Sequence, residues 1–187
     1  MSVWTIFLIA VGLAMDCFAV SLGAGTAGVA TGKRSIFRLF FHFGLFQGGM
    51  TVLGWLGGTT IEPYIASVDH WIAMGLLGFV GVRMVHEGLQ KAEEARYKTD
   101  PSRGSTLIML SVATSIDALA VGLSLAMLRV NVFGAALLIG LVSSALSLIG
   151  LLVGKQLGLR FGKTMEVIGG LILLGIGVRI VLTHLTV

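Results

Sequence analysis

Six long apolar stretches constrain this chain more than any other feature. Each holds roughly the 20 residues that a helix needs to cross the hydrocarbon core of a bilayer. Only 12% of the 187 residues are charged and 56% are apolar, whereas about a quarter of an ordinary soluble chain is charged. The stretches are continuous rather than alternating, which favours helices over the strands of a membrane barrel. The sequence therefore predicts an all-α integral membrane protein of six transmembrane helices. The predicted spans are Val3–Gly25, Ile36–Thr60, His70–Leu89, Ser105–Met127, Val132–Gly154 and Met165–Thr186.

Lysines and arginines lie almost entirely on one side of this predicted membrane. Ten of them follow the first, third or fifth span, whereas Arg129 alone follows an even-numbered one. Basic residues mark the cytoplasmic connections, so we expect both termini outside and the connection at 90–104 in the cytoplasm. The first stretch lacks the basic start of a signal peptide, so we expect it to be retained. The net charge of +4 is explained by this orientation, and no nucleic-acid partner is expected. The ten residues are Lys33, Arg34, Arg38, Lys91, Arg96, Lys98, Arg103, Lys155, Arg160 and Lys163.

The two halves of the chain repeat one another. Met15–Gly23 (MDCFAVSLG) aligns with Ile116–Ser124 (IDALAVGLS) at an offset of 101 residues. The triplet Gly-Val-Arg that ends in Arg83 returns at Arg179, at an offset of 96. We predict a first three-helix repeat at 1–89, a linker at 90–104 and a second repeat at 105–187. Since three spans is an odd number, the second repeat is inverted, the plan of many secondary transporters.

An aspartate lies near the middle of the first span and another near the middle of the fourth. Asp16 and Asp117 are equivalent in the repeat, and each costs roughly 3 kcal/mol to place at that depth on insertion scales. Two such carboxylates close together in a dry site cannot both stay charged without a counter-charge. We therefore expect a metal ion or protons to neutralise them.

The alternative is that each aspartate pairs with an intramembrane arginine, Arg83 or Arg179. Both arginines lie nearer the ends of their spans, from which they can reach the interface. Arg83 also has Glu87 one turn later as a local partner. These positions favour a metal or protons over the arginines as partners of the aspartates.

Further oxygen-bearing side chains lie at comparable depth. Gln47 aligns with Ser143 and Thr51 with Ser147, both at offset 96, and Thr114 lies one turn before Asp117. Together with the aspartates they predict a site for a hard divalent cation such as Mn²⁺, Mg²⁺ or Ca²⁺. Individually, serine and threonine in membrane helices more often link helices than bind ions. Glu166 opens the sixth span, where stabilisation of the helix N-terminus is the favoured role.

The repeated aspartate motif, the pair Gly54-Trp55 and the Gly-Val-Arg repeat resemble the bacterial manganese efflux pump family, MntP. The resemblance extends over essentially the whole chain. It implies export of Mn²⁺ across the bacterial inner membrane, with Asp16 and Asp117 as the intramembrane aspartates of the family. Some members carry Glu where this chain has Gln47 and proline where it has Thr51.

Export of a divalent cation against an inside-negative potential needs an energy source. The sequence contains no GxxxxGK[ST] loop for a nucleotide, so we expect an ion gradient, with proton antiport as the hypothesis. Mn²⁺ is then a transported substrate and no cofactor is expected. Another divalent cation, or a small solute as in lysine exporters, stays open as the substrate, and so does the oligomeric state. An intramembrane aspartyl protease is disfavoured because the aspartates stand in MDC and SID rather than in YD and GxGD patterns; we expect no enzyme.

Overall fold

The computed structural model describes residues 2–28, 32–65, 69–89 and 101–185, and every regular element in these ranges is an α-helix. Most helix ends fall within a few residues of the predicted spans, because the apolar stretches and the polar connections between them define both. The connection predicted at 90–104 lies mostly outside the described residues, and so do the side chains of Glu87, Glu166 and Arg179. The helices are α1 (Val3–Thr26), α2 (Lys33–Ile65), α3 (Asp69–Leu89), α4 (Gly104–Met127) and α5 (Val132–Leu185).

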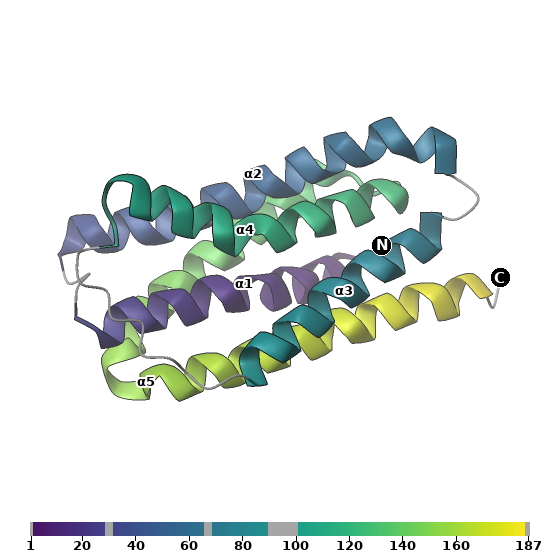
Figure 1. Cartoon of the computed structure of the whole chain (residues 1–187). Coiled ribbons are helices and arrows are strands. Elements are labelled where there is room, and N and C mark those ends of the chain that lie inside the picture. Colours follow the sequence, from purple (N-terminus) through teal and green to yellow (C-terminus); the bar gives the residue numbers. More distant parts are fainter. Residues whose placement is uncertain (1, 29–31, 66–68, 90–100, 186–187) are drawn as a thin grey trace.

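Helix α5 covers both the fifth and the sixth predicted span. Its 54 residues are assigned as one helix, which would measure about 80 Å if it were straight. The ribbon instead turns back on itself, so that its green first part and its yellow last part run in opposite directions (Figure 1). The connection between the fifth and sixth predicted spans, residues 155–164, is therefore itself helical. The sequence between the two predicted spans carries glycines at 158 and 162, and glycine is a common site of sharp helix bends.

The distribution of polar and apolar side chains is that of a membrane protein. Gln47, Thr51 and Ser147 are completely buried, whereas Trp4, Phe133 and Leu137 are 76%, 71% and 65% exposed. Apolar side chains on the outside and polar ones inside fit a lipid surrounding. Four described stretches are long and apolar enough to cross a bilayer: Val3–Thr26, Lys33–Thr60, Gly104–Met127 and Val132–Gly154. Within the residues that are described, α3 contributes a shorter apolar helix, Met74–Arg83.

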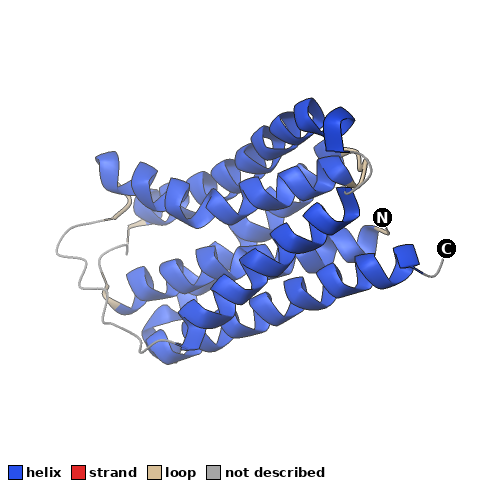
Figure 2. Cartoon of the chain, turned by 45° about the vertical axis from the view of Figure 1, so that its right-hand side comes forward, coloured by secondary structure: helices blue, strands red, loops and turns tan. Residues whose placement is uncertain are grey.

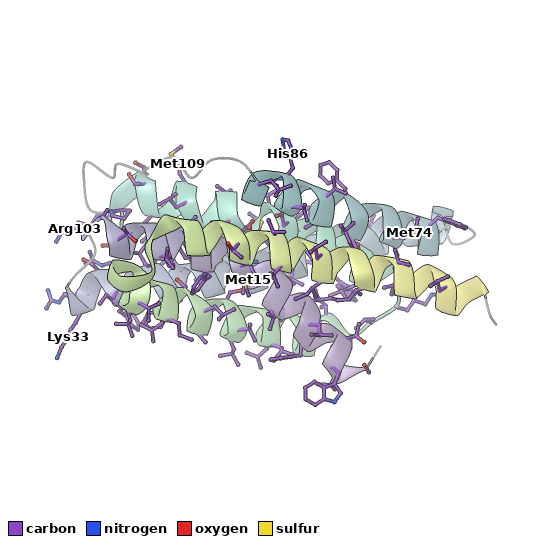
Figure 3. The ribbon with its side chains drawn as sticks, turned by 90° about the horizontal axis from the view of Figure 1, so that it is seen from below. Met15, Lys33, Met74, His86, Arg103 and Met109 are labelled. Carbon is purple, nitrogen blue, oxygen red and sulfur yellow. The ribbon has the colours of Figure 1, made fainter. Side chains whose placement is uncertain are left out.

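Two labelled basic residues lie at the end of the bundle opposite the chain termini (Figures 1, 2 and 3). Both chain termini lie at one end (Figures 1 and 2). Lys33 and Arg103 lie at the opposite end, and Met15 lies near the middle (Figure 3). Asp16 directly follows Met15 in the sequence.

Contacts between helices in the first half of the chain recur in the second half, at the offsets of 96 and 101 residues found in the sequence. A Cβ atom on Gly54 would meet the carbonyl oxygen of Leu119, and one on Gly150 would meet that of Phe18. Gly54 and Gly150 are 96 positions apart, and Phe18 and Leu119 are 101 apart. The packing of α2 on α4 is thus repeated by α5 on α1, which keeps both aspartate-bearing helices in close backbone contact with a neighbour.

The ends of α1 and α4 also match. Gly28 has φ +68° and Arg129, 101 positions later, has φ +52°. In α4 the Arg129 amide donates to the Ala126 carbonyl and the Val130 amide to the Leu125 carbonyl, the pattern of a Schellman cap. The Gly28 amide donates to the Gly25 carbonyl in the same way. Arg129 therefore adopts a left-handed conformation at a position where its counterpart is glycine.

Candidate cation site

Asp117 lies in the middle of α4 and forms an ion pair with Arg83 of α3. The Arg83 guanidinium donates a hydrogen bond to Asp117 Oδ1 across 2.6 Å. The Asp117 side chain is 5% exposed and that of Arg83 is 32% exposed. The expectation that Arg83 would leave the aspartates for the interface is therefore wrong. Its long side chain reaches inward, where the cost of a nearly buried carboxylate makes a cationic partner favourable.

Asp16 lies on α1 beside side-chain contacts that join α1 to α2. The neighbouring Cys17 is fully buried, and its thiol donates a weak hydrogen bond to Gln47 Oε1 of α2 at 3.9 Å. Gln47 Nε2 donates to the Leu13 carbonyl oxygen at 3.2 Å, so the amide is fixed against α1 at both ends. Gln47, one of the predicted site residues, thus contacts the segment that carries Asp16.

One turn further along α1, a second polar contact joins α5. The hydroxyl oxygens of Ser21 and Ser147 are 2.5 Å apart, and both residues are completely buried. Ser143, one turn earlier on α5, is also completely buried, and among the described residues its hydroxyl has no hydrogen-bond partner. Buried hydroxyls are normally satisfied, so Ser143 offers both a donor and an acceptor to a group in this part of the bundle.

Thr51 and Thr114 bond within their own helices. The Thr51 hydroxyl donates to the Gln47 carbonyl at 2.8 Å, and that of Thr114 donates to the Leu110 carbonyl at 2.9 Å. A hydroxyl that gives its proton to a carbonyl one turn earlier keeps its lone pairs for a cation. These threonines are therefore suitable ligands, although the same bonds also suit a purely structural role.

The candidate residues offer a mixture of oxygen atoms rather than a cage of carboxylates. Nowhere in 2–28, 32–65, 69–89 and 101–185 do three or more His, Cys, Asp or Glu side chains form a group that could hold a metal ion. Two carboxylates, one amide and several hydroxyls are a donor set that suits hard divalent cations. Nothing in this set provides the multiple thiolate or imidazole ligands that zinc or copper prefers.

The contact of Cys17 with Gln47 was not predicted, and the pairing of Arg83 with Asp117 was only the disfavoured alternative. Cys17 stands next to Asp16 in the repeated motif, and Arg83 stands in the repeated Gly-Val-Arg triplet, so both carried a signal. Which neighbour each side chain meets depends on how α1 and α3 are rotated against α2 and α4, and the sequence alone does not define that rotation.

Fold and site together define a multi-pass helical membrane protein with a polar, acid-containing interior. A family model described as "Putative manganese efflux pump" matches residues 30–181. Proteins that carry that description with the name MntP are similar over nearly their whole length. The one from Syntrophotalea carbinolica is 50% identical over 184 residues, 98% of each chain. The one from Citrifermentans bemidjiense is 53% identical over 180 residues, 96% of each chain.

A third relative, from Nitratidesulfovibrio vulgaris, is 48% identical over 178 residues, 94% of this chain and 89% of its own. No solved structure matches this chain. The chain belongs to the MntP manganese efflux pump family. This is a family of transporters, not of enzymes, and the resemblance noted from the aspartate motifs is confirmed.

Proposed function

We propose that this protein exports Mn²⁺ from the bacterial cytoplasm and binds it at mid-depth between Asp16 and Asp117. The observation that carries the proposal is a nearly buried carboxylate, Asp117, held in an ion pair inside a bundle whose outer surface is apolar. Intramembrane carboxylates are costly and mark ion pathways. Membership of a family described as manganese efflux pumps supports Mn²⁺ as the substrate.

The proposed ligands are the two aspartates with oxygen atoms from α2, α4 and α5. Gln47, Ser143 and Ser147 are completely buried, and Gln47 lies against the segment that carries Asp16. The unsatisfied Ser143 hydroxyl supports a ligand role at that position. The full proposed set is Asp16, Asp117, Gln47, Thr51, Thr114, Ser143 and Ser147.

We further propose that residues 1–89 and 105–187 form two inverted three-helix repeats that give six membrane crossings. The recurrence of the Gly54 contact at Gly150 and of the α1 cap at the end of α4 supports this plan. The oppositely directed parts of α5 would supply the fifth and sixth crossings. In such repeats the substrate site lies near the midplane, where the halves meet.

The proposed location is the inner membrane, with both termini outside and the 90–104 connection in the cytoplasm. Support comes from the end of the bundle opposite the termini, where Lys33 and Arg103 lie (Figure 3). Basic residues are enriched on the cytoplasmic side of membrane proteins.

Proton antiport is the proposed source of energy. Export of a doubly charged ion against an inside-negative potential costs about 4.6 kcal/mol per 100 mV. The aspartates would bind Mn²⁺ when ionised and accept protons on the outward side as the metal leaves. In proteoliposomes loaded with Mn²⁺ and placed in Mn²⁺-free buffer, acidification of the interior as Mn²⁺ leaves would support the exchange. Mn²⁺ flux indifferent to an imposed pH gradient would refute it.

A growth assay tests the substrate. A bacterial strain that lacks its own manganese exporter should become resistant to Mn²⁺ when it carries this gene, and Asp16→Asn or Asp117→Asn should abolish the resistance at equal protein levels. Resistance to Co²⁺, Zn²⁺ or lysine in place of Mn²⁺ would reassign the substrate. Full rescue by both aspartate variants would remove the proposed site.

A further inference from the structure

Arg83 occupies the same carboxylate that we assign to the transported metal. A divalent cation binds a carboxylate oxygen at roughly 2.0–2.6 Å, and the Arg83 guanidinium already lies 2.6 Å from Asp117 Oδ1. A metal ion and a guanidinium repel each other at such distances. The two cations therefore compete for Asp117.

The two partners differ in their freedom to move. Asp117 is nearly buried, whereas about a third of the Arg83 side chain is exposed. The backbone of α3 is anchored two residues earlier, because a Cβ atom on Gly81 would meet the carbonyl oxygen of Gly170 on α5. Val80 is 1% exposed, which fixes the same turn. The flexible arginine side chain can therefore leave the pair while its helix stays in place.

We propose that Arg83 is a tethered cation that holds Asp117 while the site lacks metal and withdraws when a divalent cation binds. This inference rests on the function proposed above. It makes Arg83 a determinant of specificity. A divalent ion gains about twice the Coulomb energy of a monovalent ion at the same carboxylate, so it can displace the guanidinium where Na⁺ or K⁺ cannot.

Mn²⁺ binding to the purified full-length protein tests this role. Arg83→Gln keeps a polar side chain of similar length but removes the competing charge. In choline chloride we expect it to bind Mn²⁺ about tenfold more tightly than the wild type, the size of effect a close charge exerts on a carboxylate. Replacing choline by 0.2 M Na⁺ should weaken Mn²⁺ binding by the variant several-fold and leave the wild type unchanged. Equal or weaker Mn²⁺ binding by the variant, without an effect of Na⁺, overturns the proposal.

Two further variants separate a local effect from a general one. Arg83→Lys keeps the charge and should keep Na⁺ ineffective. Arg103→Gln removes a positive charge at the exposed end of the bundle and should leave both measurements as in the wild type. Equal tightening by Arg103→Gln would mean that the overall charge, and not Arg83, controls affinity, which overturns the proposal.

Chemical restoration of the charge covers the case in which Arg83→Gln does not fold. Arg83→Cys can be treated with a methanethiosulfonate that adds either an ethylammonium or a neutral methyl group. The native Cys17 is fully buried, and wild-type protein treated in the same way gives the background. The ammonium adduct should lower Mn²⁺ affinity relative to the methyl adduct, and equal affinities overturn the proposal.

Aspartate variants distinguish failure of this inference from failure of the proposed function. If Asp16→Asn and Asp117→Asn abolish Mn²⁺ binding but Arg83→Gln changes nothing, the metal site stands and the tethered cation is wrong. If Mn²⁺ binding persists in both aspartate variants, the proposed site and the inference fall together.

Discussion

Gly44 of α2 and Gly140 of α5 pack backbone against backbone in a reciprocal contact. A Cβ atom on Gly44 would meet the carbonyl oxygen of Gly140, and one on Gly140 would meet that of Gly44. The two glycines are 96 positions apart, so this crossing joins a residue to its own counterpart in the other half. A contact of this kind is what a twofold relation between the halves produces on its axis.

Because Gly44 and Gly140 contact each other, a larger side chain at either position should lower the stability of the protein by a similar amount. Gly44→Val and Gly140→Val should each destabilise the protein by about 1–3 kcal/mol through overpacking, seen as a lower midpoint of thermal unfolding in detergent. Gly49→Ala on the same helix is the matched control, because nothing lies within 4 Å of its added Cβ atom. A normal midpoint for both valine variants would contradict this close packing.

The ion pair between Asp117 and Arg83 predicts different effects of Asp117→Asn on stability and on Mn²⁺ resistance when Arg83 is also replaced. Asp117→Asn leaves the arginine without its carboxylate, and breaking a buried pair on one side costs about 3–5 kcal/mol, less where one partner is partly exposed. Asp117→Asn combined with Arg83→Gln should recover part of that stability yet show no Mn²⁺ resistance. Thermal unfolding and the growth assay read the two effects separately. Restored resistance in the double variant would show that Asp117 is a structural partner of Arg83 and not a ligand.

Ser21 and Ser147 share one hydrogen bond but have different proposed roles. Each alanine variant should lose about 0.6 kcal/mol of stability and at most about 1.7 kcal/mol, the average and the largest value for hydrogen bonds between membrane helices. Only Ser147→Ala should also weaken Mn²⁺ binding, because Ser21 is not in the proposed ligand set. Equal Mn²⁺ affinities for the two variants would reduce Ser147 to a contact between α1 and α5.

Adding a negative charge at position 47 tests whether Gln47 is a ligand of Mn²⁺. Gln47→Glu places a third carboxylate beside the Asp16 segment and removes the hydrogen bond to the Leu13 carbonyl. We expect tighter Mn²⁺ binding, by about tenfold, since carboxylates are the preferred ligands of hard cations. Gln47→Leu, similar in size but without oxygen, should weaken it. Isothermal titration with Mn²⁺ measures both, and identical affinities would exclude position 47 from the site.

Most of the fold could be predicted from the sequence, because crossing a bilayer demands long apolar helices. Four of the predicted spans, those that begin at Val3, Ile36, Ser105 and Val132, correspond to described stretches long and apolar enough to cross. The helical connection within α5 was not predicted, because charged side chains mark the end of an apolar stretch but do not prevent backbone hydrogen bonding.

The site was less predictable than the fold. Burial of Gln47, Ser143 and Ser147 could be expected from their depth in apolar spans. The pairing of Arg83 with Asp117 could not, because an arginine side chain long enough to reach the interface is also long enough to reach inward. Only the packing of α3 against α4 and α5 decides between the two directions.

Transport by purified protein is the most direct test of the central claim. Proteoliposomes that contain the wild-type chain, with Mn²⁺ on one side and a pH gradient across the membrane, should accumulate Mn²⁺ on the more acidic side. Asp16→Asn and Asp117→Asn should reduce this flux to that of empty liposomes, whereas Arg103→Gln should not. Mn²⁺ accumulation by both aspartate variants at the wild-type rate would contradict the account.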